Sequence, residues 1–439
     1  MPPIQGLGSS RSAPLPTRLL GLLVLTATIG SLVGGGAFGH LLPTRPGPGD
    51  VSTPLASATA PRSPGPGSEA RAGTDLGVGP AGSAPPQWIN VTPTGMGSSP
   101  PAAASAVMAY DPDSHATIFF GGCAQSQCPG NQTWAYANGT WSNLTDRKSA
   151  PPARYGAVMD YDRNMPGLLL FGGHSAGSTY LNDTWLFQNG DWTNLTRISP
   201  TAPAPREYAS MAFDPDPEEN GSVLFGGHVY NYGPSSDTWI WEGWSGWVFL
   251  NTSAPPPVSE YASMAYDPLL HAIVLYGCGD GCVTGDNWTW ELYSGQWWQV
   301  SASPPAGGVR IGSVMTWDPA LSAVLLFGGY STSYLGDSWT FAGAGWTQLP
   351  KLSTDPGGRY VPSMSSDSTG SPPLLFGGST FYPFGLNPLN DTWVFEVPPT
   401  VALSTPAAAE ASAPVNLTVS VSNGTAPYRV LFDYGDGAH

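Results

Sequence analysis

Four of the six histidines are the first candidates for chemistry in this 439-residue chain. His174 and His228 each follow a Gly-Gly pair, whereas His115 and His271 each lie a few residues after a Tyr-Asp-Pro turn. Neutral imidazoles bind transition metals, so a metal held by His174 and His228 is one interpretation. Solvated loop histidines without a ligand are the other.

No catalytic constellation accompanies these histidines. We find no Ser/His/Asp set, no glycine-rich phosphate loop and no convincing pair of carboxylates. We therefore predict no catalytic residue, no cofactor and no firm metal site, with His174 and His228 kept as weak metal candidates.

The four cysteines fall into two close pairs. Cys123 and Cys128 lie in one loop, and Cys278 and Cys282 lie in a second. Two local disulfides, formed in an oxidising compartment, are the favoured interpretation. A single four-cysteine metal site would require the two loops to meet.

The charge balance argues against one class of partner. The chain has 15 Lys and Arg against 31 Asp and Glu, a net charge of -16, and only 10% of its residues are charged. A polyanion is repelled overall by such a protein, so we predict no nucleic-acid partner. The 56 Gly and 47 Pro favour short strands and turns over helices.

The N-terminal region predicts export. Residues 19–42 contain an uncharged apolar stretch long enough to cross a bilayer, as an uncleaved anchor or as a signal peptide. Arg11 and Arg18 precede it, which places residues 1–18 in the cytoplasm. Residues 43–85, rich in Pro, Gly and Ser, read as a stalk-like linker. The expected location is the cell membrane with the remainder outside, or secretion if the signal is cleaved.

A repeat of about fifty residues organises the rest of the chain. The glycine after an apolar run recurs at Gly121, Gly172, Gly226, Gly277, Gly328 and Gly377. An Asp in a turn recurs at Asp111, Asp162, Asp214, Asp267, Asp318 and Asp367, and a Trp that usually follows Asn/Asp-Thr/Ser recurs at Trp134, Trp185, Trp239, Trp290, Trp339 and Trp393. Three landmarks with one period indicate a repeat architecture.

Each unit divides into four short strands. A strand such as "YASMAF" leads through an Asp-Pro turn to an apolar run, "SVLFGG", and a "DTWIW" type strand follows a variable loop. A tight turn such as Asn189-Gly190 then leads to "DWTNLT". In the Gly-Gly and the two tryptophans, residues 86–397 resemble kelch repeats, as in the central domain of galactose oxidase. The resemblance implies an all-β fold, a six-bladed β-propeller.

The tryptophans of the fourth strands predict how the ring closes. They occur at Trp141, Trp192, Trp247, Trp297 and Trp346, and the sixth unit ends without one. Trp88, in "PPQWINVT", precedes the first unit and matches the same strand. We expect this N-terminal strand to complete the sixth blade and cover its edge. Most tryptophans are expected in the core, whereas Trp244 and Trp298 fall outside the repeat register and are candidates for surface contacts.

The kelch resemblance also implies a binding face, where the loop after Gly-Gly and the loop between consecutive blades open together. The first class is rich in aromatic residues suited to ligand contact: Tyr180, Tyr230, Tyr232, Tyr330, Tyr334, Phe381 and Tyr382. The second contains Arg154, Arg206, Arg310 and Arg359, each eight residues before its repeat Asp. These arginines either form ion pairs between blades or line the channel mouth as a cationic collar for an acidic glycan or carboxylate.

The C-terminal residues 398–439 differ from the repeats. The stretch "NGTAPYRVLFDYGDGAH" resembles the first half of a PKD domain, an immunoglobulin-like β-sandwich, and the chain stops partway through it. Asn-x-Ser/Thr sequons begin at Asn90, Asn131, Asn138, Asn143, Asn182, Asn194, Asn220, Asn251, Asn287, Asn390, Asn416 and Asn423. Glycosylation and turn chemistry both account for them.

Two functions of different classes follow. The favoured one is an exported, membrane-tethered interaction module that binds an extracellular glycan or a surface protein through one loop face. The alternative is a carbohydrate-active enzyme, a metal-dependent oxidase or a hydrolase-like protein, built on the propeller. Neither the ligand nor the oligomeric state follows from the residues.

Overall fold

The computed structural model describes residues 85–95, 99–125, 127–145, 149–278, 287–300, 305, 309–343, 345–367, 370–381, 387–398, 400–404 and 418–422. The predicted cytoplasmic and membrane segments lie outside these residues, as does the linker except for its last residue. Within the described ranges, no helix combines the length and apolar character that a bilayer crossing requires.

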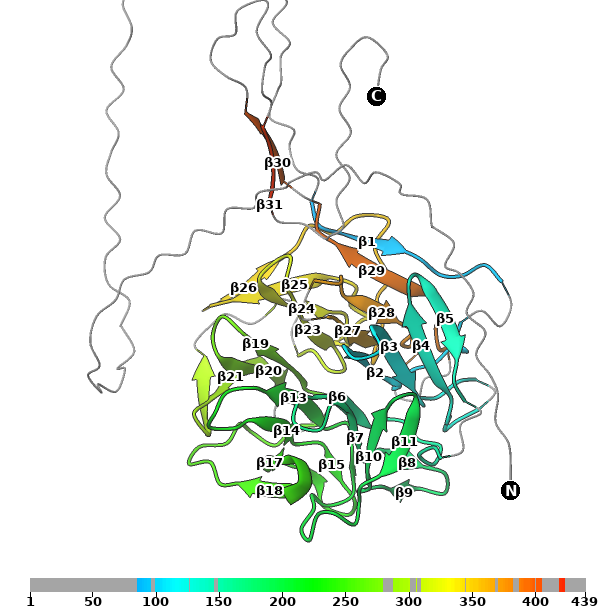
Figure 1. Ribbon diagram of the computed structural model, residues 1–439, viewed down its shortest axis with the longest axis vertical. Helices are drawn as coiled ribbons and strands as arrows, with labels where there is room; N and C mark the ends of the chain where they lie inside the picture. Colours follow the sequence, from blue (N-terminus) through cyan, green and yellow to red (C-terminus); the bar gives the residue numbers. More distant parts are fainter. Residues whose placement is uncertain are drawn as a thin grey trace, which may run out of the picture. The chain divides into compact units, whose positions relative to one another are not determined.

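Six four-stranded antiparallel sheets make up most of the described chain (Figure 1). Numbered by their first strands, sheet 1 contains β2 (Val107–Asp111), β3 (Ala116–Phe120), β4 (Thr133–Ala137) and β5 (Thr140–Asn143). Sheet 2 contains β6 (Val158–Asp162), β7 (Gly167–Phe171), β10 (Thr184–Gln188) and β11 (Asp191–Asn194). Sheet 3 contains β13 (Ser210–Asp214), β14 (Gly221–Phe225), β17 (Thr238–Trp241) and β18 (Trp247–Leu250).

The other three sheets repeat the same order. Sheet 4 contains β19 (Ser263–Asp267), β20 (Ala272–Cys278), β21 (Asn287–Tyr293) and β22 (Gln296–Val300). Sheet 5 contains β23 (Val314–Asp318), β24 (Ala323–Phe327), β25 (Ser338–Ala342) and β26 (Gly345–Gln348). Sheet 6 contains β27 (Ser363–Ser365), β28 (Leu374–Phe376), β29 (Thr392–Glu396) and, as its outermost strand, β1 (Gln87–Asn90).

Local chemistry explains the strand boundaries. The second strand of each sheet is mostly apolar and buried, as in β7. The repeat Asp ends the first strand because its carboxylate caps the turn: Asp162 Oδ1 accepts the backbone N–H of Asn164 at 2.8 Å. Asn189 and Gly190 both have positive φ, 53° and 81°, the geometry of the predicted two-residue hairpin.

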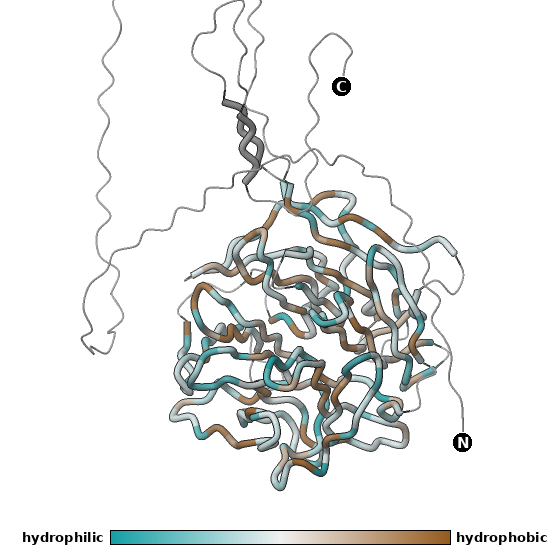
Figure 2. Tube along the Cα trace, viewed as in Figure 1, coloured by the Kyte–Doolittle hydropathy of each residue, from teal (hydrophilic) through white to brown (hydrophobic). Residues whose placement is uncertain are grey.

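The first strands of the six sheets follow one another around a closed ring. β2 contacts β6, β6 contacts β13, and the series continues through β19, β23 and β27 back to β2. Six hydrophobic clusters fill the six junctions, each built from two neighbouring sheets. Figure 2 shows the apolar stretches recurring along the strands. The core is therefore divided among the junctions between sheets.

Strand β1 closes the ring as predicted. It pairs antiparallel with β29, with Trp88 opposite Phe395. The Trp88 side chain is 2% exposed and packs edge-on against Phe327 of sheet 5 and Phe395 of sheet 6. The two ends of the repeat region are thus joined by a strand that comes from before the first repeat.

Six hydrogen bonds link consecutive sheets around this ring. In each, the indole Nε1–H of a tryptophan in an outermost strand donates to a hydroxyl at the start of the third strand of the preceding sheet. The N–O distances are 2.9–3.1 Å, and the pairs are Trp141–Thr392, Trp192–Thr133, Trp247–Thr184, Trp297–Thr238, Trp346–Thr289 and Trp88–Ser338. The predicted structural role of these tryptophans is confirmed, and each indole satisfies its polar atom in the core.

The C-terminal region is described only in part. β30 (Thr400–Ser404) and β31 (Thr418–Ser422) pair as an antiparallel hairpin. The remaining residues after 398 lie outside the described ranges, so the PKD-like sandwich stays a prediction.

Buried turn carboxylates predict an unusual pH dependence of stability. Burial raises the pKa of Asp214 to about 7 and that of Asp318 to about 6. Because the folded state binds these protons more tightly than the unfolded state, the unfolding free energy falls as pH rises from about 4 to about 7. We expect a melting temperature that is higher at pH 5 than at pH 7.5 by roughly a few °C, measured by scanning calorimetry.

The variant Asp214→Asn keeps an acceptor for the turn and should reduce this gradient. A melting temperature that rises from pH 5 to pH 7.5 in the wild type, or an unchanged gradient in the variant, contradicts the assignment.

Candidate functional site

The two predicted loop classes do share one face, which we call the loop face. In five of the six repeats, short antiparallel bridges join the loop between sheets to the loop after a Gly-Gly. Examples are Tyr155 with His174, Ile311 with Tyr330, and strand β12 (Arg206–Glu207) with β15 (His228–Val229). The face is therefore a single connected surface around the axis of the ring.

The four ring arginines are buried ion-pair residues of this face. Each is 0–1% exposed and clamps an Asp carboxylate through both guanidinium nitrogens at 2.6–2.8 Å. The same guanidinium donates to the carbonyl of the first glycine of the Gly-Gly pair. The pairs are Arg154–Asp183, Arg206–Asp237, Arg310–Asp337 and Arg359–Asp391.

Each carboxylate is held on a second side. The Asp precedes the Thr/Ser-Trp of the third strand, and the indole of that Trp donates to its Oδ2 at 2.6–2.7 Å. Burial opposes ionisation of Asp237, Asp337 and Asp391, but the hydrogen bonds and charge of the arginine lower the pKa of each. Each pair is therefore ionised, and the charge of the arginine is offset by that of its aspartate.

The pairs tie consecutive sheets together. The backbone of Arg206, in β12, is hydrogen-bonded to the segment between β7 and β10 of sheet 2, since its N–H donates to the Leu181 carbonyl and its carbonyl accepts the Gly173 N–H. Its side chain binds Asp237 of sheet 3. The two sheets without an arginine also lack the aspartate: Ala103 goes with Gln132 in sheet 1, and Ser259 goes with Trp288 in sheet 4. Arginine and aspartate thus occur together or not at all.

This arrangement contradicts the predicted cationic collar at Arg154, Arg206, Arg310 and Arg359. Each guanidinium is turned into the sheet junction, where the carbonyl and the carboxylate satisfy it, because an unpaired charge at this depth would be costly. The interpretation as ion pairs between sheets is the one the structure supports.

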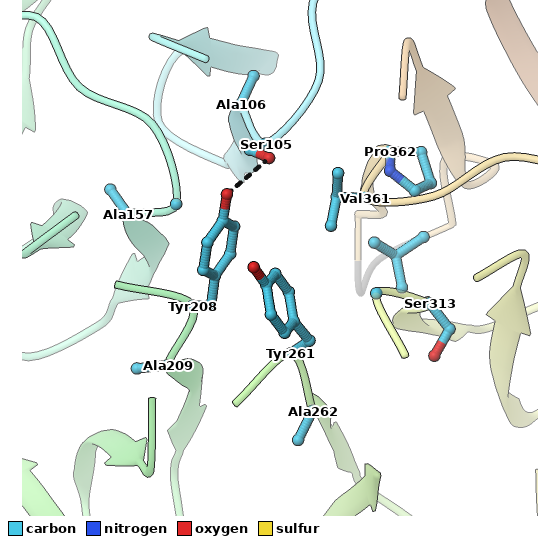
Figure 3. A pocket seen from close by; sticks show the side chains of 13 residues that line it. Ser105, Ala106, Ala157, Tyr208, Ala209, Tyr261, Ala262, Ser313, Val361 and Pro362 are labelled. Carbon is cyan, nitrogen blue, oxygen red and sulfur yellow. Dashed lines mark hydrogen bonds between the residues drawn. The ribbon is translucent and has the colours of Figure 1, made fainter. Parts of the chain in front are cut away.

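A different set of residues surrounds the axis. The residue two after each ring position has positive φ, between 44° and 61°, and its N–H donates to the carbonyl of the equivalent residue in the preceding repeat. The six N–O distances are 2.8–3.3 Å and the donors close a circle: Ser105, Gly156, Tyr208, Tyr261, Gly312 and Val361. A cavity of about 100 Å³ lies inside this circle (Figure 3).

Two tyrosines enter this cavity from strained backbone. Tyr208 and Tyr261 have φ of 52° and 60°, a region that costs about 1 kcal/mol or more for a residue with a side chain. Glycine occupies the same position at Gly156 and Gly312 without that strain. The two phenol rings lie side by side with centroids 4.0 Å apart, and the Tyr208 hydroxyl is 3.2 Å from Ser105 Oγ. Strain retained at an opening is typical of functional positions.

The cavity lies on a continuous line of aromatic rings, the aromatic track. Successive ring centroids are 4.0–6.5 Å apart. In order the members are Tyr230, Tyr180, His174, Tyr155, Tyr208, Tyr261, Tyr360, Tyr330 and Tyr334. Predicted contact residues at both ends are thereby joined through the axis by the metal candidate His174 and by four tyrosines that the sequence did not single out.

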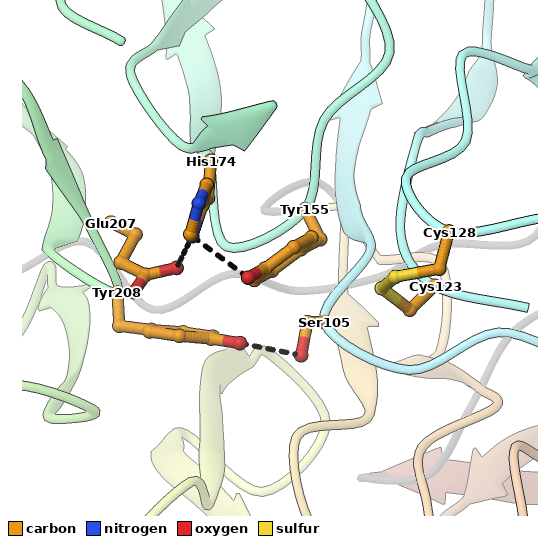
Figure 4. Close-up of a disulfide and its surroundings, with 7 residues drawn as sticks. All are labelled: Ser105, Cys123, Cys128, Tyr155, His174, Glu207 and Tyr208. Atoms are coloured by element: carbon orange, nitrogen blue, oxygen red, sulfur yellow. Dashed lines mark hydrogen bonds and ion pairs between the residues drawn. A yellow bond between two sulfur atoms is a disulfide. The ribbon is translucent and has the colours of Figure 1, made fainter. Parts of the chain in front are cut away.

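Two carboxylates border the track. His174 Nδ1 lies 2.8 Å from the Tyr155 hydroxyl and 3.1 Å from Glu207 Oε2 (Figure 4), and His228 Nδ1 lies 2.7 Å from Glu260 Oε2. Burial raises the pKa of Glu207, opposed by His174 and by a hydrogen bond from Tyr180. The side chains of Glu207 and Glu260 are 11% and 23% exposed.

The proposed metal candidates sit in these pairs. His174 and His228 each direct Nδ1 at a glutamate, with the Tyr180 ring between the two imidazoles. Within the described ranges, no group of three or more His, Cys, Asp or Glu has the arrangement of a metal site. Their geometry is that of hydrogen-bonded loop residues.

The remaining predicted residues lie around the same surface or outside the described ranges. Tyr230, Tyr232 and Phe381 are 50%, 88% and 44% exposed, and Tyr382 is not among the described residues. Cys123 and Cys128 form the predicted disulfide in the first loop (Figure 4). The second proposed disulfide, Cys278 with Cys282, stays a prediction because Cys282 lies outside the described residues. Trp244 and Trp298 are exposed, as expected.

Glu207, Glu260, Tyr208, Tyr261 and Tyr360 were missed at the sequence level. They occupy the first or second position after the ring arginine or its replacement, so alignment of the repeats on that position would have found them. Their identities vary between repeats, which is why a search for recurring residues passes over them.

Comparisons with known proteins agree with this fold. Residues 103–317 match the family model described as the KLHDC2/KLHL20/DRC7 Kelch-repeats domain. These residues are similar to kelch repeats. The protein named YjhT has a similar solved structure, with a TM-score of 0.51 and 14% identity over 75% of this chain and 99% of that one. The kelch-type β-propeller is thus supported by sequence and by structure.

Two curated proteins match shorter stretches. A tRNA wybutosine-synthesizing protein 4 from Emericella nidulans is 34% identical over 134 residues, which is 28% of this chain and 12% of that protein. A dynein regulatory complex subunit 7 from Chlamydomonas reinhardtii is 36% identical over 90 residues, 20% of this chain and 7% of that one. The chain spans only a small part of the length of either relative.

The ion pairs should govern stability. Arg206→Ala leaves the Asp237 carboxylate unpaired near the core, so we expect a loss of about 3–5 kcal/mol in unfolding free energy. The double variant Arg206→Ala/Asp237→Gln copies the Ala103 and Gln132 combination of sheet 1 and should recover at least half of that loss, measured by urea unfolding.

The exposed Arg163→Ala is the matched control, with an expected change within about 0.5 kcal/mol. If Arg206→Ala is as mild as Arg163→Ala, or if the double variant is no better than the single one, the ion pair does not carry the role assigned to it.

Proposed function

We propose that the kelch propeller is an interaction module that binds its partner through the loop face. The observation that carries the proposal is the aromatic track, which crosses the axis of the ring and is bordered by Glu207 and Glu260. Rigid rings with hydroxyl groups give large contact area at a small entropy cost, the property that binding surfaces use. One matched relative is named as a subunit of a complex, in keeping with such a role.

The finer architecture belongs to the same proposal. The six sheets are taken as the complete set of blades of a six-bladed propeller, followed by a PKD-like domain after residue 398. Residues 19–42 are proposed to export the protein and, if uncleaved, to tether it. The disulfide of Cys123 and Cys128 supports an oxidising location. The expected partner is an extracellular glycan or a surface protein.

The alternative, a carbohydrate-active enzyme, requires a proton relay or a metal. The Tyr155 hydroxyl and the Glu207 carboxylate both lie within hydrogen-bond distance of one ring nitrogen of His174, Nδ1. A proton relay uses the two ring nitrogens separately, one for each partner. No observation on the described residues favours the alternative over binding.

The test compares two faces of one molecule. Full-length protein is immobilised and screened against a glycan array and fractionated cell-envelope components. The loop-face variant Tyr180→Ser/Tyr230→Ser should lose at least tenfold in affinity for any ligand found. The matched variant Tyr161→Ser/Tyr266→Ser changes tyrosines of the first strands at the opposite ends of the sheets and should bind like the wild type.

If both variants lose affinity equally, or if only Tyr161→Ser/Tyr266→Ser loses affinity, the loop face is not the binding surface. Circular dichroism melting curves of both variants exclude unfolding as the cause.

A further inference from the structure

Resting on the proposed function, we infer that the axial cavity binds the cationic side chain of a lysine or arginine presented by a protein partner. The rings of Tyr208 and Tyr261 line the cavity. Each of these tyrosines directly follows a glutamate in the sequence, Glu207 and Glu260. The inference names the chemistry of the ligand and the part of the loop face that selects it.

The charge on this part of the face is negative. The four ring arginines do not offset this negative charge, because each forms an ion pair with an aspartate in a sheet junction. Two glutamates remain beside the track, and both hold hydrogen bonds to histidine while keeping part of the side chain accessible. An anion would be repelled by these carboxylates, whose partners are histidines and not arginines, whereas an ammonium or guanidinium would be attracted.

The electrostatic effect of the glutamates extends to the cavity. Burial is the largest cause of the raised pKa of Tyr208 and Tyr261, and the negative charge of Glu207 adds to it in both. Glu260 contributes at Tyr261 as well. A positive group in the cavity beside these two rings would therefore lie within the field of two carboxylates and next to aromatic side chains, a setting that favours cation–π attraction.

The size of the cavity selects a narrow group. Its volume of about 100 Å³ is small for a ligand pocket, which suits the end of one long side chain. Small neighbours keep it open: a Cβ on Gly156 would come within 3.1 Å of the Tyr208 ring.

The backbone strain is the independent observation. Tyr208 and Tyr261 occupy two of six equivalent positions, and the glycines at two others show that the circle forms without a side chain there. The tyrosines add strain to the circle and place aromatic rings at its axis. We attribute this strain to the placement of the two rings for a ligand, because backbone strain is typically retained at functional sites.

The probe is the peptide acetyl-Gly-Lys-Gly-amide, with its side-chain-acetylated form as the neutral match. Binding to full-length protein is followed by saturation-transfer NMR and calorimetry at 0.05 M and 0.5 M NaCl. We expect the acetylated peptide to bind at least tenfold more weakly and the higher salt to weaken the lysine peptide. The arginine analogue should bind comparably to lysine or better.

Five variants, one of them a control, locate the site. Glu207→Gln and Glu260→Gln should each weaken the lysine peptide about three- to tenfold, whereas Glu242→Gln, the same charge change on an exposed residue in the loop between β17 and β18, should not. Tyr261→Phe keeps the ring face and should retain most of the affinity, and Tyr261→Leu should lose it.

Equal binding of the two peptides, or equal effects of Glu207→Gln and Glu242→Gln, overturns the inference. If the lysine peptide fails while a glycan is bound in a way that depends on Tyr180 and Tyr230, the interaction module stands and the cationic ligand is wrong. If neither is bound through the loop face, both proposals fail.

Discussion

Six indole-to-hydroxyl hydrogen bonds around the ring are the interaction on which the structure depends. Each tryptophan covers the junction between two sheets and donates its one polar hydrogen to the neighbouring sheet, so burial and hydrogen bonding act at the same place. No single sheet can bury both of its faces alone. The closed ring solves this problem because every junction, including the one made by β1, receives the same indole.

Most of the fold could be predicted from the sequence because its landmarks recur. The Asp-Thr/Ser-Trp triplet, present in four repeats, contains three structural residues at once: the partner of the arginine, the hydroxyl that accepts the next indole, and an indole that holds the aspartate. Trp88 was predictable by counting, since the sixth repeat lacked a fourth-strand tryptophan. The recurrence of these residues therefore predicts the order of the strands and the closure of the ring.

The chemistry of the loop face was less predictable. Arg154, Arg206, Arg310 and Arg359 share a position, but spacing does not tell whether a guanidinium turns toward solvent or into a junction. The information was present in a different form, because repeats with Ala103 or Ser259 lack the aspartate. Tyr208 and Tyr261 escaped notice because the six equivalent residues include serine, glycine, tyrosine and valine, and only the backbone circle makes them equivalent.

The most direct test of the closed ring compares two indoles. Trp88, at 2% exposed, and Trp244, at 73% exposed, differ in burial and not in side chain. Trp88→Ala should lower the free energy of unfolding of the propeller by about 3–5 kcal/mol, and Trp244→Ala should change it by no more than about 0.5 kcal/mol, both measured by denaturant unfolding. Equal effects of the two substitutions would show that the N-terminal strand does not close the ring.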